Sequence, residues 1–129
     1  MSNMNTQNAS LEILTHLAEH LDGALNLPPS TGTTFGAAKI FDSAFARHWK
    51  ALRDHLTGEG VPHEDTPASV LKAASQHGLL NNLADWEQFI DLYTRSIAIN
   101  DAHQAQTIIG DLHLFTTRLK ESLQHLKTR

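Results

Sequence analysis

The feature that most constrains this sequence is a helical spacing of apolar residues that extends through nearly all of its 129 positions. Apolar residues recur three and four positions apart, and no stretch alternates apolar and polar residues as a half-buried strand would. Prolines and a glycine interrupt the pattern at positions 28–32, and further breaks fall at Gly58, Gly60 and Gly78. The sequence therefore predicts an all-α protein.

Five helical segments are expected from this pattern. Their expected ranges are 11–25, 35–57, 67–77, 83–99 and 102–127. Their expected N-caps, in the same order, are Ser10, Thr33 or Thr34, Thr66, Asn82 and Asp101. Long helices with short connections predict an up-and-down four-helix bundle with one short additional helix. We expect a single domain over residues 10–127 behind a disordered, polar N-terminal tail at 1–9.

The inward-facing stripes of these helices supply a large candidate core. Its expected members include Leu11, Leu14, Leu17, Leu21, Leu25, Ala38, Phe41, Phe45, Trp49, Leu52, Leu56, Trp86, Phe89, Phe115 and Leu119. Within this set Trp49 is expected to be a packed core residue, so that Trp49→Ala would cost about 3–5 kcal/mol of stability through the cavity it leaves.

The composition limits the cellular compartments and the kinds of binding partner that suit this chain. The chain has no cysteine, which excludes disulfides, thiolate zinc sites and cysteine nucleophiles. No apolar run approaches the ~20 residues that cross a bilayer, and the polar start lacks the order of a signal peptide. We therefore expect a cytoplasmic protein without membrane contact. The net charge of −4 disfavours broad nucleic-acid binding, which relies on neutralising many phosphates.

Patterns of catalytic chemistry are nearly absent. His16 and His20 match the H-x-x-E-H zinc pattern, and residues four apart on a helix share a face. No recognisable third-ligand segment accompanies them, so a surface pair with weak metal affinity is the simpler interpretation. Phosphate-binding loops, a G-x-G-x-x-G motif and a G-x-S-x-G elbow do not occur. The sequence predicts no cofactor, no metal centre and no catalytic residues.

A strip of small residues on the second segment carries two histidines. It comprises Ala44, His48, Ala51 and His55. The histidines could form a pH-sensitive or ligand-binding pair. Ordinary packing against another helix or another subunit is the simpler interpretation, and it makes these four residues candidates for a subunit interface.

The opposite side of the same segment carries a modest basic cluster. Arg47, Lys50 and Arg53 could contact a phosphate group or an acidic partner surface. Asp42 and Asp54 lie nearby, so a solvated, self-compensated face is the alternative.

The same segment also resembles a known family. Residues 41–56 read F-D-S-A-F-A-R-H-W-K-A-L-R-D-H-L, and residues 59–61 follow with E-G-V. They resemble F-E-x-x-F-E-L-x-W-K-x-L-K-D-Y-L-x-x-E-G-I, the signature of the nucleotidyltransferase substrate-binding proteins, a branch of the HEPN fold family. Residues 67–74 and 78–80 are similar to that family's S-P-R-x-V-I-K-x-A and G-L-I. Trp86 and Phe89 are similar to its W-x-x-M.

This resemblance covers roughly residues 35–126 and implies a fold and a function. It implies a five-helix bundle that forms homodimers. It also implies a separate minimal nucleotidyltransferase that carries the metal and the catalysis, while the helical protein helps to bind the substrate, a nucleotide or another phosphate-bearing ligand.

One departure from the wider HEPN pattern matters for activity. Related branches are RNase toxins with an R-x-x-x-x-H motif. In the register set by Trp86, Tyr93 and Ala98 stand at the arginine and histidine positions. If Arg95 is taken as the arginine, Asn100 stands at the histidine position. Neither register retains the histidine that would take the 2′-hydroxyl proton.

We therefore predict a non-catalytic substrate-binding or regulatory subunit that works with a separate nucleotidyltransferase. Its candidate ligand- or partner-binding residues are Arg47, Lys50, Arg53 and Arg95. Two alternatives stay open: a diverged dimeric helical interaction module without a nucleotide role, and a remnant of a HEPN-type RNase toxin.

Overall fold

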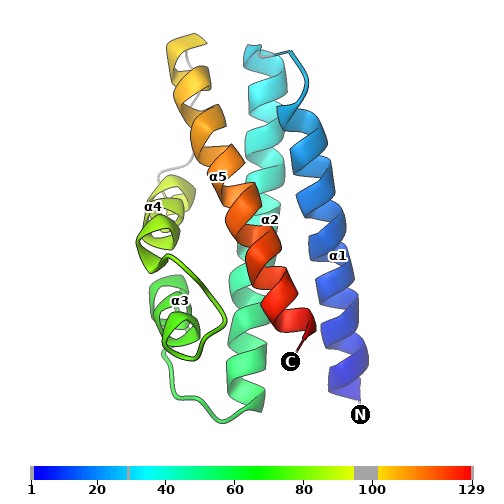
Figure 1. The fold of residues 1–129 in the computed structure, drawn as a ribbon, viewed down its shortest axis with the longest axis vertical. Coiled ribbons are helices and arrows are strands. Elements are labelled where there is room, and N and C mark those ends of the chain that lie inside the picture. The colour runs from blue at the N-terminus through cyan, green and yellow to red at the C-terminus, as the bar shows by residue number, and fades with distance from the viewer. Residues whose placement is uncertain (1, 29, 95–101, 129) are drawn as a thin grey trace.

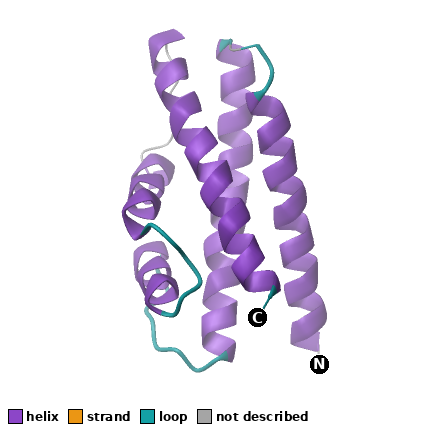
Figure 2. Cartoon of the chain, in the orientation of Figure 1, coloured by secondary structure: helices purple, strands orange, loops and turns teal. Residues whose placement is uncertain are grey.

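The computed structural model describes residues 2–28, 30–94 and 102–128, and in these ranges the chain forms helices and short connections without any strand (Figure 2). The helices are α1 (Ser2–Leu25), α2 (Thr31–Gly58), α3 (Pro67–Gln76), α4 (Leu83–Thr94) and α5 (Ala102–Lys127). The prediction of an all-α protein with five helices is confirmed. None of the described helices is both long enough and apolar enough to cross a membrane.

The three long helices lie side by side along the long axis of the molecule (Figure 1). α1 runs antiparallel to α2 and α5 and packs against both of them. α3 and α4 lie one above the other on the far side of α2 and α5 from α1. Together α3 and α4 cover this side of the bundle.

The first helix begins earlier than the sequence suggested. α1 starts at Ser2, so the predicted N-cap at Ser10 is wrong, and the segment assigned to a disordered tail is helical from Ser2 onward. Residues 2–8 contain neither proline nor glycine. Because extending an existing helix by one residue costs far less than nucleating it, polar residues can continue a helix that is anchored further along.

The second helix also begins earlier than predicted. Its N-cap is Ser30, whose hydroxyl oxygen accepts a bond from the backbone N–H of Thr33, while the Thr33 hydroxyl oxygen accepts one from the Ser30 N–H. This reciprocal pair is a capping box, and it satisfies two backbone donors at once. Thr33 therefore belongs to the first turn, and neither Thr33 nor Thr34 is the cap. The helix ends at Gly58, and Gly60 follows with a φ of 72°.

The boundaries of α3 agree closely with the sequence. The Thr66 hydroxyl oxygen caps the helix by accepting a bond from the N–H of Ser69, and Pro67 stands in the first turn, where its missing N–H costs nothing. Gly78 ends the helix with a φ of 81°, which allows the Leu79 N–H to reach the Ala74 carbonyl oxygen at 2.9 Å.

The predicted C-terminal end of α4 lies outside the described residues. The structure describes α4 up to Thr94, so its predicted extension to position 99, the candidate residue Arg95 and the predicted cap Asp101 are not placed. Ahead of α4, Asn82 adopts a φ of 59°, and its carbonyl oxygen accepts a 2.9 Å bond from the Asp85 N–H.

An aromatic cluster forms the centre of the core. The Phe115 ring of α5 contacts Phe41 and Phe45 of α2 and Trp86 and Phe89 of α4, with ring centroids 4.8–6.5 Å apart. All five side chains are almost fully buried. Most of the predicted core residues are buried as expected. Leu17 and Trp49 are only partly buried at its edge, so the expectation of a fully packed Trp49 is corrected.

Candidate functional site

The outward face of α2 is cationic and open to solvent. Arg47 and Lys50 stand one turn apart on this face, and both side chains are exposed. They lie there because the apolar residues of α2, spaced three and four apart, turn the opposite side of the helix into the core. In the described part of the chain, neither cation forms an ion pair.

Arg53, the third predicted member of the basic cluster, is already engaged. Its Nε donates to the Asp54 carboxylate at 3.2 Å, and its Nη1 donates to the Asp65 carboxylate at 3.3 Å. Partial burial lowers the pKa of Arg53, but these hydrogen bonds outweigh it and raise the pKa above its ordinary value. The guanidinium also lies 5.5 Å from the ring centroid of Trp49, within cation–π range.

The structure therefore divides the predicted basic cluster in two. Arg53 matches the self-compensated alternative, because Asp54 and Asp65 already neutralise it. Arg47 and Lys50 remain available for an acidic or phosphate-bearing ligand. Asp42 on the same helix is half-buried, and burial raises the pKa of its carboxyl although Lys39 lowers it in part.

The strip of Ala44, His48, Ala51 and His55 is buried within the chain, at exposures of 0–9%. These side chains therefore pack between helices, as the simpler interpretation held, and do not form a surface for a second subunit. The assignment as interface candidates is corrected on this ground. α2 is covered on this side because α3 and α5 pack against it and Trp86 of α4 stacks on His48.

His48 is the most unusual member of this strip. Its Nε2 lies 2.7 Å from the hydroxyl oxygen of Ser122, and its ring stacks on Trp86 with centroids 4.7 Å apart. Burial lowers the pKa of His48 from 6.5 to about 3, because the charged form cannot be solvated there. His48 is thus a neutral core residue that hydrogen-bonds across the bundle.

A set of polar contacts that joins the ends of α2 and α3 was not predicted from the sequence. The carboxylate of Glu59 pairs with His55 Nε2 at 2.8 Å and with His77 Nε2 through its other oxygen. The hydrogen bond from His77 is the main cause that lowers the pKa of Glu59. The four-residue spacing of His55 and Glu59 was a usable signal. No local spacing in the sequence indicated the contact of His77, because it is eighteen residues from Glu59.

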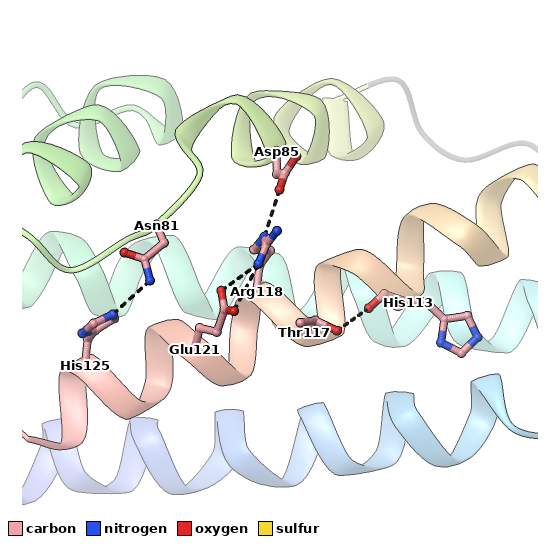
Figure 3. A network of polar contacts seen from close by, with 7 residues as sticks. All are labelled: Asn81, Asp85, His113, Thr117, Arg118, Glu121 and His125. Atoms are coloured by element: carbon pink, nitrogen blue, oxygen red, sulfur yellow. Dashed lines mark hydrogen bonds and ion pairs between the residues drawn. The ribbon is translucent and has the colours of Figure 1, made fainter.

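A second polar network joins α4, the α3–α4 connection and α5 (Figure 3). Arg118 Nε donates to Asp85 at 2.9 Å and Nη1 donates to Glu121 at 3.0 Å, and these hydrogen bonds raise the pKa of Arg118. Asn81 reaches His125 Nε2 at 3.4 Å. Every charge in the centre of this network has a partner, which is typical of a structural contact.

Two observations bear on the binding of metal ions and small molecules. Within residues 2–28, 30–94 and 102–128, no group of three or more histidine, aspartate or glutamate side chains is arranged to hold a metal ion. A hollow between α1, α2 and α5 is open to solvent and has a volume of about 10 Å³, which is about the room that one water molecule needs. Its lining comprises Ala24, Leu25, Leu27, Thr33, Thr34, Ala37 and Ile109.

Comparison with known proteins does not assign this chain to a family. The sequence matches no protein-family model, and no curated protein shows significant similarity to it. The resemblance to the nucleotidyltransferase substrate-binding proteins therefore stays a prediction. The candidate site is the pair Arg47 and Lys50 on the open face of α2.

Proposed function

We propose that this protein is a cytoplasmic, non-catalytic substrate-binding or regulatory subunit that works with a separate minimal nucleotidyltransferase, on a HEPN-like helical bundle. The observation that carries the proposal is the pair Arg47 and Lys50, which are exposed on the helix whose sequence resembles that family's signature and form no ion pair with the described residues. Two exposed cations one turn apart on a helix suit carboxylates of a partner or phosphate oxygens of a ligand.

The residues of the resembling segment support this division of labour. Its aromatic and aliphatic positions, such as Phe41 and Leu52, lie in the core, while Lys50 faces solvent. The apolar part of the signature then specifies the fold, and the basic part is available for recognition. Neither register of the R-x-x-x-x-H motif retains its histidine, which favours a binding role over RNA cleavage.

The resemblance also leads us to propose a homodimer. Because the strip around His48 is buried, a second copy would use a different surface of the bundle. Sedimentation equilibrium of the purified chain measures the oligomeric state directly, and a monomer at all concentrations would remove this part of the proposal.

The test of the main proposal is to search the reading frames beside that of this chain for a minimal nucleotidyltransferase with a G-S-x-x-x-x-x-D-x-D motif, to purify it and to measure its binding to this chain. We expect a complex by isothermal titration calorimetry, weakened several-fold in Lys50→Ala and in Arg47→Ala. Lys127→Ala changes an exposed lysine of α5 that lies outside the resembling residues 35–126; it is the matched control and should bind as the parent does. All three variants should keep the parent's melting temperature.

Two outcomes would redirect the assignment. Absence of a complex, together with no thermal shift on adding nucleotides, would favour the interaction module without a nucleotide role. RNA cleavage by the purified chain that disappears in Arg95→Ala would favour the RNase remnant.

A further inference from the structure

A pair of histidines on the outer face of α1 is independent of the α2 site. His16 and His20 are both exposed, and 74% of the His16 side chain is open to solvent. They stand four residues apart in an unbroken helix, so their side chains leave the same face one turn apart. Two imidazoles at this spacing can reach a single ion, as they do in helical zinc motifs.

The surroundings of the pair leave its nitrogen atoms accessible. The Glu19 carboxylate lies 4.0 Å from His16 Nδ1, which is too far for a hydrogen bond, and 68% of the Glu19 side chain is exposed. No hydrogen bond to His20 comes from the part of the chain that the structure describes.

At the C-terminal end of α2 a histidine and a glutamate stand at the same four-residue spacing, but there both groups are already engaged in contacts with protein side chains. In α2, His55 Nε2 lies 2.8 Å from the Glu59 carboxylate, and only 8% of the His55 side chain is exposed. His77 occupies the other oxygen of that carboxylate. A metal ion would have to displace these contacts in α2, whereas the side chains of His16 and His20 are exposed to solvent.

We propose that His16 and His20 chelate one divalent first-row transition metal ion, such as Zn²⁺, Ni²⁺ or Cu²⁺. The pair supplies two nitrogen ligands, and water completes the coordination, because no third histidine or carboxylate among the described residues is arranged to join them. The ion is therefore exchangeable. Binding should follow the usual order for nitrogen sites, with Cu²⁺ tighter than Ni²⁺.

Titration of the full chain with NiCl₂ tests the proposal. By calorimetry we expect one principal site, weakened at least tenfold in His16→Ala and in His20→Ala. His113→Ala, an exposed histidine on α5 without a neighbour at this spacing, should bind as the parent does. By NMR, paramagnetic Ni²⁺ should broaden the amide signals around residues 16–20 first.

The outcomes that would overturn the proposal are equally specific. Ni²⁺ affinity that survives the His16→Ala/His20→Ala double variant, or early broadening centred on α2 or α5, would place the metal elsewhere. Both histidines are exposed, so the variants should fold, and circular dichroism melting curves verify this.

Discussion

At the scale of single residues, burial decides what a side chain can do. His48 is enclosed between Ser122 and Trp86 and cannot be solvated when charged, so it stays neutral. Trp49 lies on the same helix one residue further, yet it remains partly exposed beneath the Arg53 guanidinium. Adjacent residues of one helix therefore have quite different effects on stability.

His48 should make the protein acid-sensitive. Its pKa is about 3 in the folded protein and 6.5 without burial. Between these values the unfolded chain binds more protons, so the free energy of unfolding falls as the pH drops, by up to about 1.4 kcal/mol per pH unit. Above pH 6.5 His48 is neutral in both the folded and the unfolded chain, so its titration no longer changes the free energy of unfolding. Urea unfolding at several pH values should give a shallower pH dependence for His48→Gln. An equal slope in the variant and the parent would contradict this assignment.

The two tryptophans should differ in their contributions to stability. Trp86 is fully buried and contacts Phe89 and Phe115. Trp86→Ala should therefore cost about 3–5 kcal/mol through the cavity it creates. Trp49→Ala should cost only about 1 kcal/mol, because part of that side chain is already exposed. Denaturant unfolding of both variants measures the difference, and equal losses would mean that Trp49 is packed as deeply as Trp86.

At the scale of helices, caps and connections hold α3 in place. Thr66 caps its first turn, while His77 at its end pairs with Glu59 at the end of α2. The low pKa of Glu59 means that this pairing stabilises the protein above the ordinary pKa of glutamate and is lost as the pH falls through the folded value. The two ends of α3 are thus stabilised by different kinds of contact.

Removing the cap of α3 should have a measurable local cost. Thr66→Ala leaves the Ser69 N–H without its 3.3 Å bond, which typically costs about 1 kcal/mol. Thr117→Ala is the matched control, because its exposed hydroxyl donates only to the His113 carbonyl oxygen of its own helix. Thermal unfolding should show a clear loss for the first variant and almost none for the second. Similar melting temperatures would argue against the cap.

At the scale of the whole molecule, one aromatic cluster joins helices that are distant in sequence. The Phe115 ring of α5 contacts rings from both α2 and α4, so it connects two of the long helices to α4. The polar network of Arg118 with Asp85 and Glu121 reinforces the same junction from the outside (Figure 3). The bundle should therefore unfold as one cooperative unit.

Phe115→Ala should weaken the whole bundle. We expect a loss of about 3–5 kcal/mol, which is a large share of the stability of a domain of this size. Phe35→Ala is the control, because 51% of Phe35 is exposed; its effect should stay within roughly 0.5 kcal/mol. Unfolding followed by circular dichroism and by tryptophan fluorescence should give coincident transitions. Separate transitions would show that α3 and α4 unfold independently of the long helices.

The sequence by itself determined the helical character, most of the core and the signals at the ends of α3. These features depend on residues within about four positions of one another, such as Thr66 with Ser69 or the apolar spacing of α2. It also placed Arg47 and Lys50 on the polar face of α2, since that face is a local property of one helix.

Only the tertiary structure decided which side chains are enclosed and which charges are paired. His48 meets Ser122 across 74 positions of sequence, and Lys120 meets Asp22 across 98. No local spacing encodes such contacts, because they form only when helices pack and exclude water. For the same reason, the sequence could not separate the engaged Arg53 from the unpaired Arg47 and Lys50. Packing brought Asp65 to Arg53 and no carboxylate of the described chain to the other two.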